Sequence, residues 1–235
     1  MIKPIPKTLL TLFICCSAFI AKAQLGYNFS QWDVGTSVAF NQVKGDAQTQ
    51  TTMPSINFNI TFNSTPFVNY VLEAQLGKLR GGDSVATSTG RYFNNDFYAI
   101  IFRGQLQFGE FLDYSHSRLA NAFKNMYVSA GVGFVNNHIT QINRYSQMIP
   151  GFYTGGQNRS QDPLIPLRIG YEFKLYNKYD KPSVRIDFAY EANIDLSDNL
   201  DGFTTPNHHD MYTQFTMGVK FALGGLSSYR KQIIY

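Results

Sequence analysis

The chain has 235 residues, of which 15% are charged and an equal share are aromatic. Soluble domains carry roughly 25% charged residues, so this composition excludes an ordinary solvated surface. The formal net charge of +4 includes two N-terminal lysines, and the remaining excess is too small to indicate a nucleic-acid partner.

The first 23 residues have the parts of a secretory signal peptide. Lys3 and Lys7 precede an apolar run over residues 9–20, and small residues end the segment at Ala23. Both cysteines lie inside the run, so cleavage near Ala23 is expected to leave no thiol or disulfide. No other run approaches the roughly 20 apolar residues of a membrane-spanning helix.

After the signal, eight segments alternate apolar and polar residues with a period of two. This pattern predicts extended strands with one apolar and one polar face. In chain order the segments are residues 32–41, 56–63, 69–77, 98–109, 127–134, 165–174, 184–196 and 214–223. The alternation is clearest over 184–196. A helix over these residues would place apolar and polar side chains on the same sides. Within 98–109, Ile101 is the one large apolar exception on the polar face.

The connections between these segments alternate in length. Residues 44–52, 80–95, 137–162 and 197–210 are long and polar, whereas 63–67 and 177–182 are short. Residues 110–124 do not fit this alternation of lengths. A short amphipathic helix is predicted there from the near-helical spacing of Leu112, Leu119 and Phe123, with Asp113 as its N-cap. An even-stranded meander with short turns at one end and long loops at the other is typical of outer-membrane barrels.

Two features indicate that the apolar faces point toward lipid. The polar faces are rich in glycine and serine, which suit a narrow lumen, and the apolar faces carry no charged residue. A charge facing lipid near the bilayer midplane costs roughly 2–4 kcal/mol. The fold prediction is therefore all-β: an eight-stranded antiparallel up-and-down transmembrane β-barrel. The alternative is a secreted lipocalin-like barrel with an apolar cavity and solvated charges.

The polar faces predict a lumen closed by ion pairs. An eight-stranded barrel is only wide enough for side chains to fill it, and charges confined there must pair. The charges on these faces nearly cancel. They are Arg103, Arg168, Lys174, Arg185 and Lys220 against Asp33, Glu73, Glu172, Asp187, Glu191 and Asp195.

Together with the strand pattern, three segments resemble the small outer-membrane β-barrel family of the OmpA/OmpX type. They are the signal end at Ala23-Gln24, Gly26-Tyr27-Asn28-Phe29, and Gly170-Tyr171-Glu172-Phe173-Lys174. The resemblance implies a barrel over residues 24–225 in the outer membrane of a Gram-negative bacterium. Residues 226–235 would form a short periplasmic tail where larger relatives have a peptidoglycan-binding domain.

For function, the resemblance implies a non-enzymatic barrel with a structural or surface-interaction role. The implied partners are outer-membrane lipid, lipopolysaccharide, the barrel-assembly machinery, and extracellular or secretion partners. The alternatives are an accessory barrel of a secretion apparatus similar to PorT, a small diffusion pore, and a lipid-A-modifying enzyme.

Candidate reactive residues form no recognisable site in the sequence. His208-His209-Asp210, His138 and Ser115-His116 place no base beside a nucleophile at a spacing that implies contact. We therefore predict no catalytic, cofactor or metal site. Asp83-Ser84-Val85 resembles a bacterial O-glycosylation sequon, which makes Ser84 a candidate for modification.

Overall fold

The computed structural model describes residues 26–45, 49–83, 85, 87, 89–112, 114, 117–178, 181–204 and 210–230. The predicted signal peptide and Ser84 lie outside these residues. Within them, no helix is long and apolar enough to cross a membrane.

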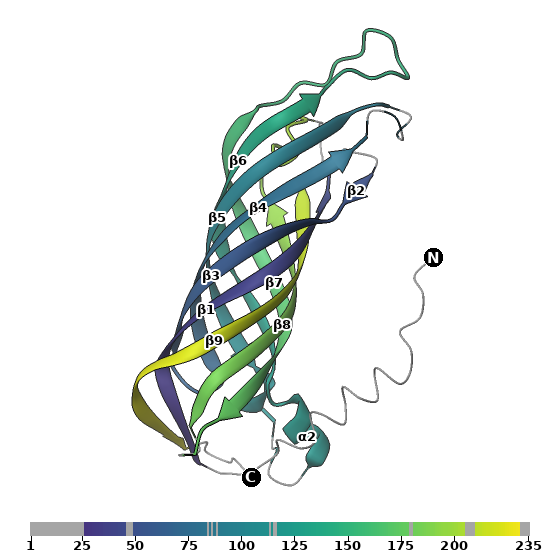
Figure 1. The fold of residues 1–235 in the computed structure, drawn as a ribbon. Coiled ribbons are helices and arrows are strands. Elements are labelled where there is room, and N and C mark those ends of the chain that lie inside the picture. Colours follow the sequence, from purple (N-terminus) through teal and green to yellow (C-terminus); the bar gives the residue numbers. More distant parts are fainter. Residues whose placement is uncertain are drawn as a thin grey trace.

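Eight antiparallel strands close into a ring, which confirms the predicted barrel (Figure 1). They are β1 (Gly26–Lys44), β3 (Met53–Asn63), β4 (Val68–Gly82), β5 (Tyr92–Gln107), β6 (Met126–Asn143), β7 (Arg159–Tyr176), β8 (Pro182–Asp195) and β9 (Met211–Arg230). Each strand pairs with its neighbour in the sequence, and β1 pairs with β9 to close the ring. A two-residue strand, β2 (Gln50–Thr51), pairs with the end of β4.

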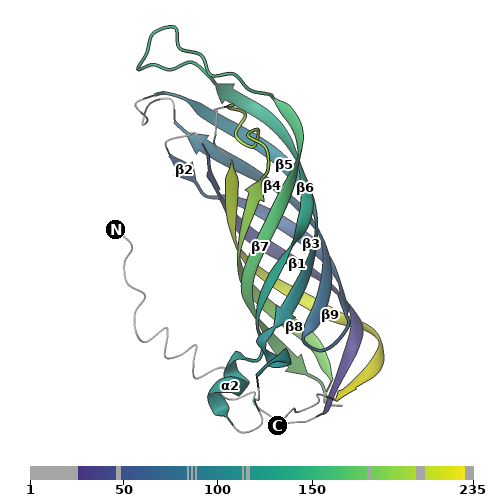
Figure 2. The same cartoon turned by 180° about the vertical axis from the view of Figure 1, so that it is seen from behind.

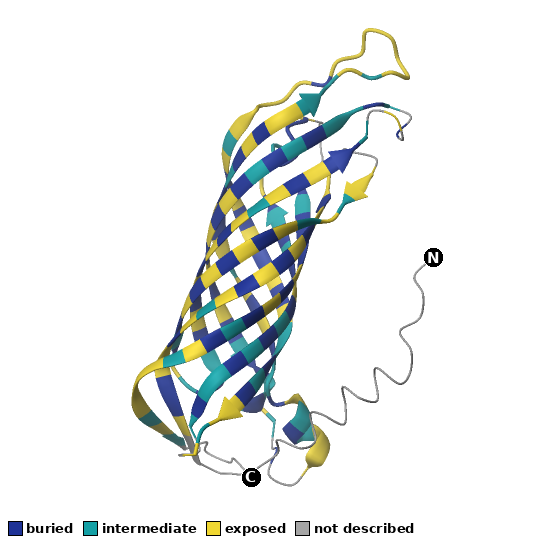
Figure 3. Cartoon of the chain, viewed as in Figure 1, coloured by how far each residue is buried: buried dark blue, intermediate teal, exposed yellow. Residues whose placement is uncertain are grey.

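The wall of the barrel has an exposed apolar outside and a buried polar inside. On β3, for example, Ile56 and Phe58 are about half exposed while Asn57 and Asn59 are buried. The same alternation runs along the neighbouring strands and gives the checkered wall of Figure 3. This is the sense expected of a barrel surrounded by lipid, not of a soluble barrel with an apolar cavity.

The two ends of the barrel differ in their connections (Figures 1 and 2). We call one the turn end: it holds the turns 64–67 and 177–181, the segment with η1 (Phe108–Glu110) and α2 (Arg118–Phe123), the start of β1 and the end of β9. The other, the loop end, holds the connections 45–52, 83–91, 144–158 and 196–210.

Several strands extend further than the alternation predicted. Strand β6 continues to Asn143 and β7 begins at Arg159, so the loop predicted over 137–162 shortens to 144–158. Strand β9 continues to Arg230 and pairs Leu226 with Ser30, so the tail predicted from residue 226 begins as strand. Backbone pairing therefore continues beyond the residues whose polarity alternates in the sequence.

The predicted amphipathic helix exists but begins later than expected. Helix α2 starts at Arg118, and the Ser117 side chain accepts a hydrogen bond from the Ala120 N–H. Ser117 is therefore the N-cap, and Leu112 precedes the helix. Asp113 lies outside the described residues. Serine and aspartate are equally favourable N-cap residues, so residue type alone did not decide between Asp113 and Ser117.

Candidate functional site

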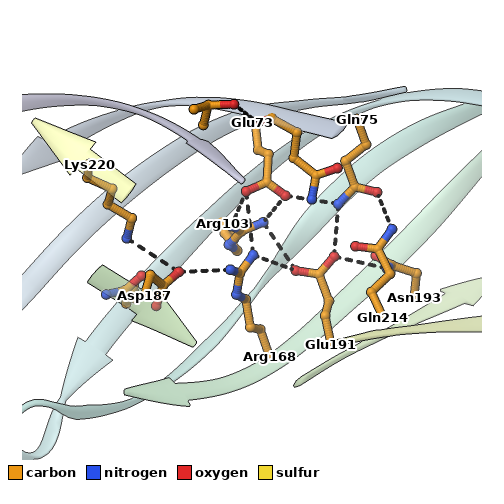
Figure 4. A network of polar contacts seen from close by, with 12 residues as sticks. Glu73, Gln75, Arg103, Arg168, Asp187, Glu191, Asn193, Gln214 and Lys220 are labelled. Atoms are coloured by element: carbon orange, nitrogen blue, oxygen red, sulfur yellow. Dashed lines mark hydrogen bonds and ion pairs between the residues drawn. The ribbon is translucent and has the colours of Figure 1, made fainter. Parts of the chain in front are cut away.

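The middle of the lumen holds two arginines among three carboxylates, all of them buried. Arg103 lies 2.6 Å from Glu73 and 3.3 Å from Glu191. Arg168 lies 3.4 Å from Glu73, 3.3 Å from Glu191 and 2.9 Å from Asp187. Figure 4 shows these groups converging from opposite walls. The pairs therefore join strands that are not neighbours, such as β4 and β7.

Four further predicted residues extend the network toward the turn end. Lys220 lies 2.5 Å from Glu172 and 3.8 Å from Asp187, which connects it to Arg168. Arg185 lies 2.5 Å from Asp33. The structure thus brings nine of the eleven predicted residues into ion pairs.

The other two, Lys174 and Asp195, do not form the predicted ion pairs. The Lys174 ammonium donates to the Pro66 carbonyl at 2.9 Å and to Gln107 Oε1 at 2.6 Å. Asp195 Oδ1 accepts two hydrogen bonds from Ser197, from its N–H and its hydroxyl, each at 3.0 Å. Asp195 is the last residue of β8 at the loop end, and Lys174 lies near the turn end of β7. Both therefore lie near the ends of the lumen.

A layer of neutral polar residues, which the sequence prediction missed, lies beside the ion pairs. Gln75 donates to Glu73 at 2.9 Å and to Glu191 at 3.0 Å. Its carbonyl oxygen accepts from the Tyr212 hydroxyl and from Gln214, each at 3.0 Å. The sequence signal that could have identified Gln75 is its position, two residues after Glu73 on the same face of β4. Gln75 supplies hydrogen bonds that a buried carboxylate needs.

At the loop end the lumen also holds a cluster of buried apolar side chains, which the expectation of a polar interior did not include. On β5 the inward side chains change from Arg103 to Ile101 and Phe97. The connection 196–210 brings Leu200 and Phe203 into contact with them. We call this cluster the loop-end plug: Val43, Leu79, Phe93, Phe97, Ala99, Ile101, Val135, Ile139, Leu164, Leu200, Phe203 and Tyr212. In the sequence pattern, Ile101 was the one residue of the loop-end plug that departed from the polar face.

Aromatic residues close the turn end of the lumen. Phe67 is buried against Tyr114 and Tyr229, with ring centroids 6.0 and 6.3 Å away. The Lys174 ammonium lies 5.1 Å from the centre of the Phe67 ring. The Tyr229 hydroxyl donates to Glu110 at 3.1 Å, which ties the end of β9 to η1. Buried side chains therefore lie at both ends of the lumen as well as in the middle.

Asp210 is a buried carboxyl in the connection at the loop end. Its Oδ2 accepts from the N–H groups of Leu200 and Asp201 at 3.0 and 3.3 Å. Burial, followed by the negative charges of Asp201 and Asp198, raises the pKa of Asp210 to about 9. The folded chain therefore keeps this carboxyl protonated at pH values where an unfolded chain ionises it.

This raised pKa predicts a pH-dependent stability. Because the folded state binds the extra proton, the free energy of unfolding should fall as pH rises from about 4, the ordinary aspartate pKa, to about 9. Asp210→Asn keeps the acceptor oxygen but has no proton to lose, so its stability should fall less over this range. Denaturant titrations at both ends of the range measure the difference. Asp96→Asn, on a half-exposed carboxyl, is the control, and equal slopes in both variants would contradict the assignment.

The reactive residues considered in the sequence form no catalytic arrangement in the described part of the chain. His138 Nδ1 accepts from Arg159 Nε at 3.1 Å on the exposed surface. The Asp210 carboxyl group accepts hydrogen bonds from backbone N–H groups, as described above. Ser115, His116, His208 and His209 lie outside the described residues. The described residues also contain no group of three or more side chains placed to hold a metal ion.

Comparison with known proteins shows the fold. No protein-family model and no curated protein matches the chain. Among solved structures, Neisserial surface protein A matches with a TM-score of 0.50 and 10% identity over 83% of this chain and 98% of that one. Ail of Yersinia pestis matches with a TM-score of 0.44 and 11% identity over 85% and 99% of the two chains. At such identities the likeness to the first shows an outer-membrane β-barrel fold and nothing finer.

Proposed function

We propose that this protein is a non-enzymatic outer-membrane barrel that presents an apolar loop to partners outside the cell. The turn end would face the periplasm and the loop end the exterior, as in barrels with short periplasmic turns and longer extracellular loops. The packed lumen supports a display role over a transport role. Its side chains occupy the interior of the barrel, and the wall then serves as a rigid support for the loops.

The observation that carries this proposal is the tip of the connection 144–158. Five large apolar side chains on it are between 49% and 64% exposed, and Figure 1 shows the loop projecting beyond the rest of the loop end. They are Tyr145, Met148, Ile149, Phe152 and Tyr153. Loops are usually polar at their tips, and a contiguous exposed apolar patch marks an interaction surface.

Several contacts fix the conformation of this loop, which favours a binding role over chance exposure of its apolar side chains. Tyr145 and Tyr153 form a β-bridge, and their rings lie 5.2 Å apart. At its base, Arg144 donates to the Gly202 carbonyl at 2.9 Å, beside Phe203 of the loop-end plug. The backbone N–H of Gln147 donates to the Thr89 carbonyl of the adjacent connection at 2.9 Å. A loop ordered in advance loses less entropy when it binds.

The test is adhesion of cells that produce the barrel in their outer membrane. Cells with the unaltered protein should adhere to apolar surfaces or immobilised extracellular proteins more than cells without it. Serine at Met148, Ile149 and Phe152 should abolish that gain. Heat-modifiable migration on a denaturing gel confirms equal amounts of folded barrel.

The matched control is Val85→Ser, which changes an even more exposed apolar residue on another connection of the loop end. This variant should adhere like the unaltered protein. Adhesion that is unaffected by the three serines, or is lost equally in the control, would refute a binding role for the tip.

A further inference from the structure

A second exposed apolar surface lies at the opposite end of the barrel, on the segment that joins β5 to β6. Phe111, Leu119 and Phe123 are 72%, 73% and 51% exposed. Leu119 and Phe123 are four residues apart in α2, so they lie side by side on one face of the helix. Exposed groups of this size are costly in water and indicate a surface that is covered in the cell.

The hydrogen bonds of α2 place it over the rim of the barrel wall. The Tyr171 hydroxyl donates to the Ala122 carbonyl at 2.8 Å, and Tyr171 belongs to the lipid-facing side of β7. The Glu172 N–H donates to the Asn125 carbonyl just after the helix, at 3.2 Å. Ala120, on another side of α2, packs against the Phe67 and Tyr114 cluster that closes the lumen. The helix therefore reaches from the mouth of the lumen to the outer wall.

The outer wall beside α2 is the aromatic border of the lipid-facing surface. The Tyr171 ring lies 4.7 Å from Phe173, which in turn lies 5.9 Å from Phe188. Trp32 and Phe62 form a similar pair on β1 and β3, 5.0 Å apart. Aromatic girdles of this kind lie at the membrane interface. A helix bonded to a girdle tyrosine lies at the same depth, so its apolar face continues the lipid-facing surface.

We propose that α2 is an interfacial anchor whose Leu119 and Phe123 dip into the phospholipid surface at the turn end of the barrel. The occupant is lipid because the face is continuous with a wall that lipid already covers. The exposed Arg118 beside Leu119 adds a positive charge suited to phosphate headgroups. The other turns at this end, 64–67 and 177–181, are too short to carry such a helix.

The chain contains a single tryptophan, which permits a direct test by fluorescence. Phe123→Trp and, separately, Leu119→Trp are made with Trp32→Phe and reconstituted in phosphatidylcholine vesicles whose acyl chains carry bromine, a contact quencher. Both variants should emit at short wavelength and lose most of their fluorescence relative to vesicles without bromine. Both replaced side chains are already exposed, and heat-modifiable migration confirms that the barrel is folded.

Two matched variants calibrate the measurement in the same background. Phe102→Trp, outward on the middle of β5, should be quenched, whereas Val85→Trp, 91% exposed at the loop end, should not. If the two α2 variants behave like Val85→Trp, the face is open to water and is reserved for a protein partner, and lipid docking is refuted. Quenching at only one of the two positions also refutes docking of the face.

Discussion

Replacing Arg185 by alanine is expected to lower the free energy of unfolding by about 3–5 kcal/mol, because it strands a buried carboxylate. The Arg185 side chain is almost wholly buried and lies 2.5 Å from Asp33. It also donates to Asn63 Oδ1 at 3.1 Å. Without the guanidinium, the hydrogen-bond partners left to Asp33 in the described part of the chain are neutral: Asn63 at 2.6 Å and Ser30 at 3.5 Å. Denaturant unfolding of the reconstituted barrel, followed by Trp32 fluorescence, measures the loss.

Two variants separate the stranded charge from other effects of the substitution. Lys78→Ala removes an exposed ion pair with Asp96 and should cost no more than about 1 kcal/mol. Arg185→Gln combined with Asp33→Asn removes both charges and keeps hydrogen-bonding groups, so it should recover most of the loss. If Arg185→Ala costs no more than Lys78→Ala, the lumen is wet enough to solvate Asp33, and the closed interior is wrong.

The reconstituted barrel is expected to pass at most small and infrequent current steps across a planar bilayer. Three groups of buried side chains follow one another along the lumen: the loop-end plug, the ion pairs around Arg168, and the aromatic cluster around Phe67. An ion would have to break the Arg168 contacts with Glu73, Glu191 and Asp187 to pass the middle layer. Because the interior of an eight-stranded barrel is only just wide enough for side chains, we expect no wider route around this layer.

Removing one layer should not open the channel, because the other two remain. Leu200→Ala with Phe203→Ala thins the loop-end plug and should leave the current unchanged, while lowering stability through the cavity it creates. Large, stable, ohmic steps from the unaltered protein would refute the closed lumen and support a diffusion pore. Such steps only from the double variant would show that the plug alone closes the lumen.

The alternation of residues was sufficient to predict the barrel because each face meets a single environment over the membrane-spanning length. The charge of Arg168 was therefore correctly placed inside. Its partners could not be predicted, since Glu73 lies 95 positions away, on a strand that meets β7 only across the closed ring. The near balance of charge predicted that pairs exist, but the tilt and closure of the sheet decide which atoms meet.

The failures of prediction lie at the two ends of the lumen. Phe97 lies on the inward face of β5, but only the folding back of Leu200 and Phe203 turns that position into an apolar core. Lys174 was predicted to pair with a carboxylate because it lies on an inward face with the other lumen charges, yet it donates to the Pro66 carbonyl of the turn. In both cases a connection supplies the partner, and connections lack the periodicity on which the prediction depends.

The pairing of β1 with β9 sets the order of events during biogenesis. It joins the first strand of the barrel to the last, over Gly26–Lys44 and Met211–Arg230. Every other pair of the ring joins strands that are neighbours in the sequence, whereas this one can form only when both the first and the last strand are present. Until then β1 presents an unpaired edge, which is a template for aggregation. The edge of β1 is therefore the part of the sheet that must be kept from pairing with other chains until β9 closes the ring.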